Sequence, residues 1–422
     1  MEPPPEVVSQ IVARASSPGY DDWWSRVEHA GFCSSPVELR GRDASGRPVT
    51  ILARCKNRRA AVCPSCSALY SGDTWQLVHR GIAADDSEDN GRPMVFVTLT
   101  APGFGAVHST SRSGDPCRPG PAARCEHGRS LRCTLIHEAS DLRLGEPLCP
   151  ECYDYFGHVL FTWHAPQLWH RFTVALRRLV QQRAADAVLS YVKVVELQRR
   201  GVPHFHAVIR LDDTTALSAA DLAALIHRAA ASLRLDVLSF GGELVTLRFG
   251  SQTDVQPLRI TPGEDDDRRV ASYLAKYVTK SVADFGLSPR RLSPRAVANL
   301  DVRPHVRAIL ETVLELADSP GPEEMTRWLH TLGYRGHITT KTRAYSTTMG
   351  ALRAHRAQWR VANGKRVEDE RPAPAIRWRF VQVGHRNKGD RLLATTADVA
   401  ARISRLAARE ELACRPDDGL GL

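Results

Sequence analysis

Residues 191–211, with the sequence YVKVVELQRRGVPHFHAVIRL, decide how the fold of this chain is interpreted. Two apolar and β-branched runs, Tyr191–Leu197 and His204–Leu211, flank the segment Arg199-Arg200-Gly201, which favours a turn. The pattern predicts a β-hairpin. If the hairpin turns about residue 200, Glu196 lies directly across from His204 on the same face of the sheet.

The sequence His204-Phe205-His206 suits a metal site, because side chains two residues apart in a strand project from the same face. Together with Glu196, the two imidazoles offer a partly filled site to Mg²⁺ or Mn²⁺, with positions open for water and a phosphate oxygen. An exposed strand face with a satisfied histidine pair shows the same pattern, and it is the better interpretation of this motif alone. The metal hypothesis therefore depends on a second signal.

Residues 270–280, VASYLAKYVTK, predict a helix with two chemically different sides. Positions i, i+3, i+4 and i+7 form one side, and they hold Tyr273, Lys276, Tyr277 and Lys280. The apolar side, able to dock on a sheet, holds Ala271, Leu274 and Val278. A phenol with a pKa of about 10 is a poor nucleophile, but nearby cations and a metal-polarised phosphodiester ease its attack. An ordinary amphipathic helix with aromatic edges is the alternative.

The remaining elements predict an α+β fold. Strands are expected at Met94–Thr100, Leu244–Phe249 and Val255–Ile260, and helices at Trp163–Ala187, Leu217–Leu235 and residues 268–283. The order strand, helix, hairpin, helix, strands is typical of an antiparallel sheet with helices packed on one face.

Three motifs in this order resemble those of the HUH endonucleases, specifically the rolling-circle replication initiators: a strand with TLT, HFH on a strand, and YLAKY on a helix. The segments FVTLTAPG, CKNRRAAVCPSC, PLCPECYDY, GVPHFHAVIR and LGYRGH are similar to replication initiators of actinomycete plasmids and integrative conjugative elements. This resemblance runs from about Cys33 to Gln358, and it implies an HUH endonuclease core.

The resemblance also implies roles for the helix. Tyr273 would attack the scissile phosphate of single-stranded origin DNA and become linked to the 5′ phosphate, which releases a 3′ hydroxyl to prime synthesis. Tyr277, one turn further along, would serve the closing strand transfer. Lys276 would place or neutralise the phosphate.

The same resemblance implies that His204 and His206 hold the catalytic Mg²⁺ or Mn²⁺. Glu196 as the third ligand follows from the hairpin geometry alone. Families differ in the group that completes the site, so Asp254 is the alternative.

The cysteines predict structural zinc. Cys33, Cys55, Cys63 and Cys66 include a C-x-x-C pair and offer a site of four thiolates. A second C-x-x-C pair lies in the Gly-, Pro-, Cys- and His-rich segment 101–155, where the candidate ligands are Cys125, Cys133, Cys149 and Cys152. Cys117, His127 and His137 lie nearby, and their spacing does not decide which four groups bind. We expect one or two zinc ions, whose binding would supply the folding energy of a coreless insertion.

Composition limits the class of protein. The chain has 422 residues, 43% of them hydrophobic, which excludes a disordered chain and permits two or three domains. Lys and Arg number 57 against 47 Asp and Glu, so the net charge of +10 favours a polyanionic partner such as DNA. There is no apolar span of membrane length and no secretory signal at the N-terminus, so we expect a cytoplasmic protein that does not bind membranes.

We expect three regions. Residues 1–90 would be an irregular zinc-binding region, residues 91–290 the HUH endonuclease domain with the insertion 101–155, and residues 291–422 a mainly helical region. In that last region Arg353, Arg356 and Arg360 share one side of a predicted helix and could follow a DNA backbone. No G-x-x-x-x-G-K-[ST] phosphate loop occurs, so the protein would depend on a host helicase and DNA polymerase.

Two other functions remain open. A conjugative relaxase or an HUH transposase would use the same chemistry on a different DNA end. A zinc-stabilised DNA-binding regulator would bind single- or double-stranded origin DNA and cut nothing.

Overall fold

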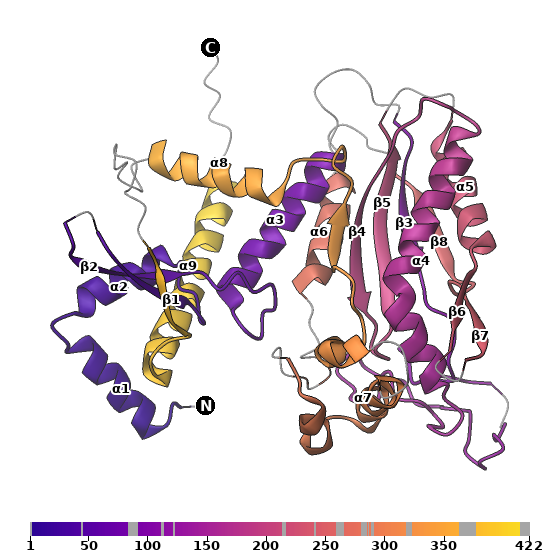
Figure 1. Ribbon diagram of the computed structural model, residues 1–422, viewed down its shortest axis with the longest axis horizontal. Helices are drawn as coiled ribbons and strands as arrows, with labels where there is room; N and C mark the ends of the chain where they lie inside the picture. Colours follow the sequence, from indigo (N-terminus) through magenta and orange to yellow (C-terminus); the bar gives the residue numbers. More distant parts are fainter. Residues whose placement is uncertain are drawn as a thin grey trace. The chain divides into compact units, whose positions relative to one another are not determined.

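The computed structural model divides into two compact units (Figure 1). We call Met1–Asp73 with Gly350–Leu422 the terminal unit, and Thr74–Met349 the sheet unit. The expected boundaries after residues 90 and 290 do not coincide with this division. The structure describes the chain except residues 1, 44, 83–91, 111–113, 121–122, 213–216, 240–241, 259–265, 280–284, 286, 288–290, 318–322, 363–376 and 414–422, and except the side chains of 266–267, 277–279, 360–361 and 408–413.

An antiparallel sheet with the strand order β8-β3-β5-β4-β9 forms the centre of the sheet unit. Its strands are β3 (Met94–Leu99), β4 (Leu189–Leu197), β5 (Pro203–Leu211), β8 (Thr253–Pro257) and β9 (Thr339–Lys341). The four longer strands were predicted. The three-residue β9 was not, because so short a segment carries no periodic pattern.

The β4–β5 hairpin has the predicted register, with Glu196 paired to His204. Its turn is closed by Gly201, which has a φ of 87° and donates its N–H to the Gln198 carbonyl oxygen at 2.7 Å. A side chain is strained at such a φ, so the glycine suits this position. The turn thereby fixes which residues of the two strands face each other.

The first face of the sheet is apolar and is covered by α4 (Tyr155–Gln181) and α5 (Ala219–Ser232). Phe205 points into this layer and stacks on Trp169 of α4, with ring centroids 5.6 Å apart. The helix α4 begins eight residues before the predicted start, where the Asp154 side chain accepts a hydrogen bond from the Gly157 N–H at 2.7 Å. Residues 158–163 are all buried, which hides the helical period in this first part of α4.

The second face carries α6 (Asp266–Thr279) and the C-terminal part of α3 (Pro64–Ile82). The Trp75 indole N–H of α3 donates to the Ser272 hydroxyl of α6 at 3.1 Å, and Arg210 of β5 donates to the Gly81 carbonyl oxygen. The prediction of helices on one face was therefore wrong. Nearly every residue of β5 is buried, so both faces of this strand need a cover.

Further elements of the sheet unit lie outside the central sheet. They are β6 (Leu235–Leu238), β7 (Leu244–Leu247), the 3₁₀ helices η2 (Pro294–Asn299) and η3 (Glu323–Thr331), and α7 (Pro304–Ala317). The predicted strand at β7 pairs with β6 in a separate two-stranded sheet. A second core, built on α7, contacts Val159 and Trp163 of α4.

The terminal unit joins the first and last parts of the chain. Its sheet has the order β10-β1-β2, and its elements are α1 (Pro5–Ala15), α2 (Tyr20–His29), β1 (Val37–Arg42), β2 (Pro48–Ala53), α8 (Met349–Ala362), β10 (Arg379–Val383) and α9 (Lys388–Ala413). Arg14 of α1 pairs with the buried Asp390 of α9 at 2.7 Å. The expectation that residues 1–90 are irregular was wrong, and the expected helical region 291–422 is shared between the two units.

The insertion forms a loop structure, as predicted. Between residues 101 and 154, the described part contains no helix or strand and only three isolated bridges. No helix among the residues that the structure describes is both long and apolar enough to cross a membrane.

Candidate functional site

The structure brings together the three side chains that the hairpin register predicted as metal ligands. Glu196, His204 and His206 each offer a ligand atom, and these atoms lie within 4.8 Å of one another. The Nε2 atom of His206 is 3.4 Å from Oε2 of Glu196, and the two imidazole centroids are 4.5 Å apart. Two nitrogens and one carboxylate oxygen therefore converge on one point of the second face.

The surroundings of the two histidines fit a bound cation. The Thr98 hydroxyl of β3 lies 3.2 Å from Nδ1 of His206, which directs Nε2 toward Glu196. The Nε2 atom of His204 is buried, and it has no hydrogen-bond partner in the part of the chain that the structure describes. Burial, helped by the neighbouring His206, lowers the pKa of His204 to about 4, so its ring is neutral at pH 7. A neutral imidazole with an unused buried nitrogen is suited to metal binding.

Asp254, the alternative third ligand, lies elsewhere. It pairs with Thr98 of β3, and β3 separates its strand β8 from β5. Its exposed carboxylate accepts from the Gln256 amide at 3.1 Å. The geometry therefore favours Glu196.

Tyr273 of α6 lies beside the histidines. Its ring packs edge-on against His206 at 5.4 Å and against Phe96 at 5.6 Å, and 40% of the residue is exposed. Ala271 and Leu274 are buried, as the helix pattern predicted. Lys276 is exposed on the same helix. The Tyr277 and Val278 side chains and all of Lys280 lie outside the described residues.

Tyr273 and the candidate metal-binding group, formed by Glu196, His204 and His206, line one cleft of about 1280 Å³. The arginines that line it are Arg118, Arg199, Arg200, Arg234 and Arg248. Among the described residues of this lining, Glu196 supplies the single carboxylate. The excess of arginine gives the cleft a positive potential, which attracts a polyanion.

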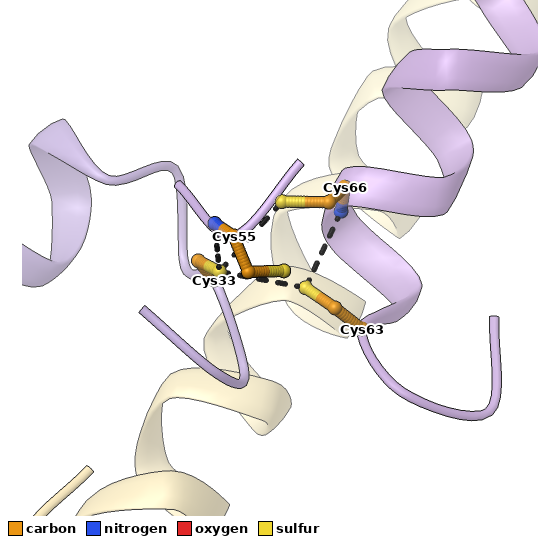
Figure 2. A group of neighbouring side chains, drawn as sticks. All are labelled: Cys33, Cys55, Cys63 and Cys66. Atoms are coloured by element: carbon orange, nitrogen blue, oxygen red, sulfur yellow. Dashed lines mark hydrogen bonds between the residues drawn. The ribbon is translucent and has the colours of Figure 1, made fainter. Parts of the chain in front are cut away.

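The four predicted thiolates of the terminal unit form a compact cluster (Figure 2). The Cys33 sulfur lies 3.6 Å from each of the Cys63 and Cys66 sulfurs. A tetrahedral zinc with bonds of about 2.3 Å places its sulfurs roughly 3.8 Å apart, so the spacing fits that ion. Backbone N–H groups also point at the sulfurs, as between Ser34 and Cys63 at 3.3 Å and between Cys55 and Cys33 at 3.3 Å.

Mutual hydrogen bonding changes the proton affinity of these thiols. The bond with Cys33 lowers the pKa of Cys63 and, more moderately, lowers that of Cys66 to about 7. Thiolates are the form that zinc binds. The pKa values of Cys33 and Cys55 are raised instead, Cys33 mainly by its hydrogen bonds to the other thiols, so the zinc assignment depends on the spacing of the four sulfurs.

The insertion contains two separate clusters, which corrects the predicted ligand set. Cys125, Cys149 and Cys152 lie together, but their fourth member is His127, with Nδ1 3.2 Å from the Cys152 sulfur. Cys133 belongs to the other cluster, which is formed by His108, Cys117, Cys133 and His137. His108 was missed, because it stands nine residues before the next ligand and no motif marks it.

Two arginines of the expected strip on α8 form ion pairs within the terminal unit. Arg356 forms a bidentate ion pair with the buried Asp73, with one of its bonds at 3.0 Å, and Arg353 lies 3.9 Å from the same carboxylate. The Arg360 side chain lies outside the described residues. These contacts show an internal role for two of the three arginines.

Comparisons with known proteins now identify the family. Residues 19–399 match the family RepSA, described as "Replication initiator protein, pSAM2". This chain belongs to the RepSA family. A curated "Replication initiator protein" of Streptomyces ambofaciens is 36% identical to this RepSA family member over 456 residues, which cover 96% of each chain. No solved structure matches this chain. The matched span includes Tyr273 and all four candidate metal-binding groups.

Proposed function

We propose that this RepSA family member starts rolling-circle replication of a plasmid or integrated mobile element by nicking and rejoining single-stranded origin DNA. The observation that carries the proposal is the position of Tyr273, whose ring packs on His206 in the cleft that contains Glu196 and His204. Family membership supports the replication role, and the arginine-rich lining supports a DNA strand as the occupant.

The reaction exchanges one phosphoester for another. The Tyr273 hydroxyl oxygen attacks the scissile phosphorus, the P–O3′ bond breaks, and the phenolic proton is lost while the leaving 3′ oxygen gains one. The product is a 5′-phosphotyrosine and a free 3′ hydroxyl. Rejoining runs the same steps in reverse with a new 3′ hydroxyl as the nucleophile.

Glu196, His204 and His206 would hold the divalent ion near this phosphate. When bound, Mg²⁺ or Mn²⁺ would draw charge from a phosphoryl oxygen. Thr98 keeps the His206 ring oriented through its hydroxyl. The exposed Lys276 would neutralise the strand beside the nick, and Tyr277, one turn further along α6, would serve strand transfer.

Structural zinc would be held by two groups, Cys33 with Cys55, Cys63 and Cys66, and Cys125 with His127, Cys149 and Cys152. Recognition of the origin would include double-stranded DNA, and a host helicase and polymerase would extend the 3′ end, because the sequence contains no phosphate loop.

A covalent-adduct assay tests the proposal. The full chain is incubated with labelled single-stranded origin DNA and Mn²⁺, and adducts that survive SDS are separated on a gel. We expect an adduct with the wild type and with Tyr70→Phe, a tyrosine of α3 outside the cleft, and none with Tyr273→Phe. DNA binding without an adduct in the wild type would contradict the proposal and favour the non-catalytic regulator.

A further inference from the structure

The group formed by His108, Cys117, Cys133 and His137 has the geometry of a closed tetrahedral site. Nδ1 of His108 and Nε2 of His137 are 3.1 Å apart, and the Cys133 sulfur is 3.4 Å from the same His137 nitrogen. Two nitrogens bound to one zinc at about 2.0–2.1 Å lie roughly 3.4 Å apart in a tetrahedron. The Cys117 sulfur is 3.9 Å from the His108 nitrogen and completes the four.

A carboxylate outside the group fixes one of its ligands. Asp141 lies 2.7 Å from Nδ1 of the buried His137 ring, and Arg143 in turn donates to Asp141 at 2.8 Å. An Nδ1–H held by this carboxylate leaves the Nε2 lone pair directed at the centre of the group. A carboxylate behind a histidine ligand is the usual support of a zinc site.

The same segment forms part of the cleft wall. Ala106 and His108 pair with residues 145–148, as in the bond from the His108 N–H to the Glu146 oxygen at 2.9 Å. Arg118 exchanges backbone hydrogen bonds with Cys133 and lines the cleft. His108 itself lines the cleft, and Cys117 is the residue before Arg118, so two ligands of the group lie at the cleft wall.

The insertion is also attached to the hairpin that carries the metal-binding group. Arg199, in the hairpin turn, donates to the Ala139 carbonyl oxygen at 2.8 Å. Gly145 has a φ of 86° and approaches the Arg199 carbonyl so closely that a Cβ would overlap it. The insertion is therefore in direct contact with the turn between β4 and β5.

We propose that His108, Cys117, Cys133 and His137 bind a zinc ion of their own, distinct from the ion of Cys125, His127, Cys149 and Cys152, and that this zinc holds the insertion in place as the wall along which the DNA strand lies. The second half rests on the proposed function, because it takes single-stranded DNA as the occupant of the cleft.

Zinc content tests the first half without any catalytic assay. Zinc per chain is measured by mass spectrometry on the purified full chain for the wild type, Cys133→Ser, Cys152→Ser and the double variant. We expect each single variant to lose one zinc and the double variant to lose two. A double variant that loses no more than either single variant would show one shared ion and overturn the proposal.

A variant that leaves the ligands intact tests the same site with less risk of unfolding the protein. Asp141→Asn keeps all four ligands, and we expect zinc to leave this site about 10- to 100-fold more readily in a chelator competition. Glu138→Gln is the matched control, because it removes the same charge from an exposed residue of the same segment. Equal zinc retention in both variants would show that Asp141 does not support a metal ligand.

Binding of a fluorescein-labelled oligo-dT strand tests the second half. With Tyr273→Phe as the common background, we expect Cys133→Ser to bind about tenfold more weakly, a loss of about 1.4 kcal/mol. Arg118→Ala should weaken binding and reduce its salt dependence by about one charge. Unchanged binding in a Cys133→Ser protein that has lost its zinc would overturn the role of the wall. Absence of an adduct in the wild type, with these results intact, would contradict only the proposed function.

Discussion

The β4–β5 hairpin and the insertion lie side by side at the cleft, but different interactions determine their structures. In the hairpin, a backbone ladder from Leu189 to Leu211 decides which residues meet. In the described part of the insertion, isolated bridges and two clusters of cysteine and histidine take that role. We therefore expect the hairpin to hold its candidate ligands in place without a metal, and the insertion to depend on bound zinc for its shape.

The largest expected effect comes from zinc removal. Structural zinc contributes about 10–16 kcal/mol in small zinc domains, so stripping the metals should unfold the insertion while the central sheet persists. Hydrogen exchange measured by mass spectrometry should show loss of protection at the bonded amides of the insertion, such as His108, Arg118 and Leu148, and retained protection at Val97 and Ala207. Unchanged protection in the insertion after chelation would show that its structure does not depend on zinc, in contradiction to the difference that we expect between the two regions.

A glycine substitution should separate the two regions without touching a ligand. Gly145→Ala places a methyl group against the Arg199 carbonyl oxygen, in addition to the strain of a positive φ. We expect a loss of roughly 2–3 kcal/mol in unfolding free energy, measured by urea denaturation. Gly114→Ala is the matched control, since this exposed glycine of the insertion has a φ of 76° and open space around it. Equal losses would mean that the contact with the hairpin contributes nothing.

The support of the hairpin site can be tested at Thr98. Thr98→Val keeps the shape of the side chain but removes the hydroxyl beside His206. We expect the affinity for Mn²⁺ to fall by about 10- to 100-fold in a calorimetric titration, with zinc content unchanged. Thr340→Val, which lies in β9 and does not line the cleft, should bind Mn²⁺ like the wild type. A loss of zinc in Thr98→Val would link two sites that we regard as separate.

The smallest expected effect concerns a cation on the apolar face of the hairpin. Burial lowers the pKa of Lys193 to about 7, and its ammonium lies 5.4 Å from the Phe205 ring and donates to the His337 oxygen at 3.1 Å. Between pH 7 and about 10.5 the unfolded chain binds more protons at this residue, so its contribution to stability rises with pH. Lys193→Met should therefore stabilise the protein most near pH 6.5, by about 1 kcal/mol, and less at pH 9.5.

Urea denaturation at the two pH values checks this pH dependence. Lys388→Met, at an exposed position of α9, serves as the control for loss of a lysine. A Lys193→Met advantage that grows toward pH 9.5 would have the wrong sign and contradict the cause we assign.

The hairpin could be predicted from the sequence more fully than the insertion. The period of two along β4 and β5 and the turn at Gly201 fix the hairpin register, so Glu196 could be placed opposite His204 from residue types alone. The sequence spacing of cysteines in a loop carries no such rule. Cys133 was grouped with Cys149 because both are cysteines of one segment, whereas the fold pairs Cys133 with His137 four residues later.

The placement of the helices could not be fully predicted either, because the pattern within one element does not include its contacts with other elements. The pattern of α6 correctly indicated that Ala271 and Leu274 are buried, but it does not say which face of the sheet receives them. The start of α4 was missed where both sides of the helix are buried, because its amphipathic period disappears there. Local patterns thus specified the elements, and long-range packing decided their arrangement.

The pairing of β1 with β10 in the terminal unit affects how the protein is synthesised in the cell. The edge of β1 pairs with β10, so Val37 meets Val383, a residue that the ribosome adds only after the whole sheet unit. A nascent or prematurely terminated chain can complete the sheet unit while β1 still exposes an unpaired edge. Correct closure of the terminal unit is therefore a property of nearly full-length translation products.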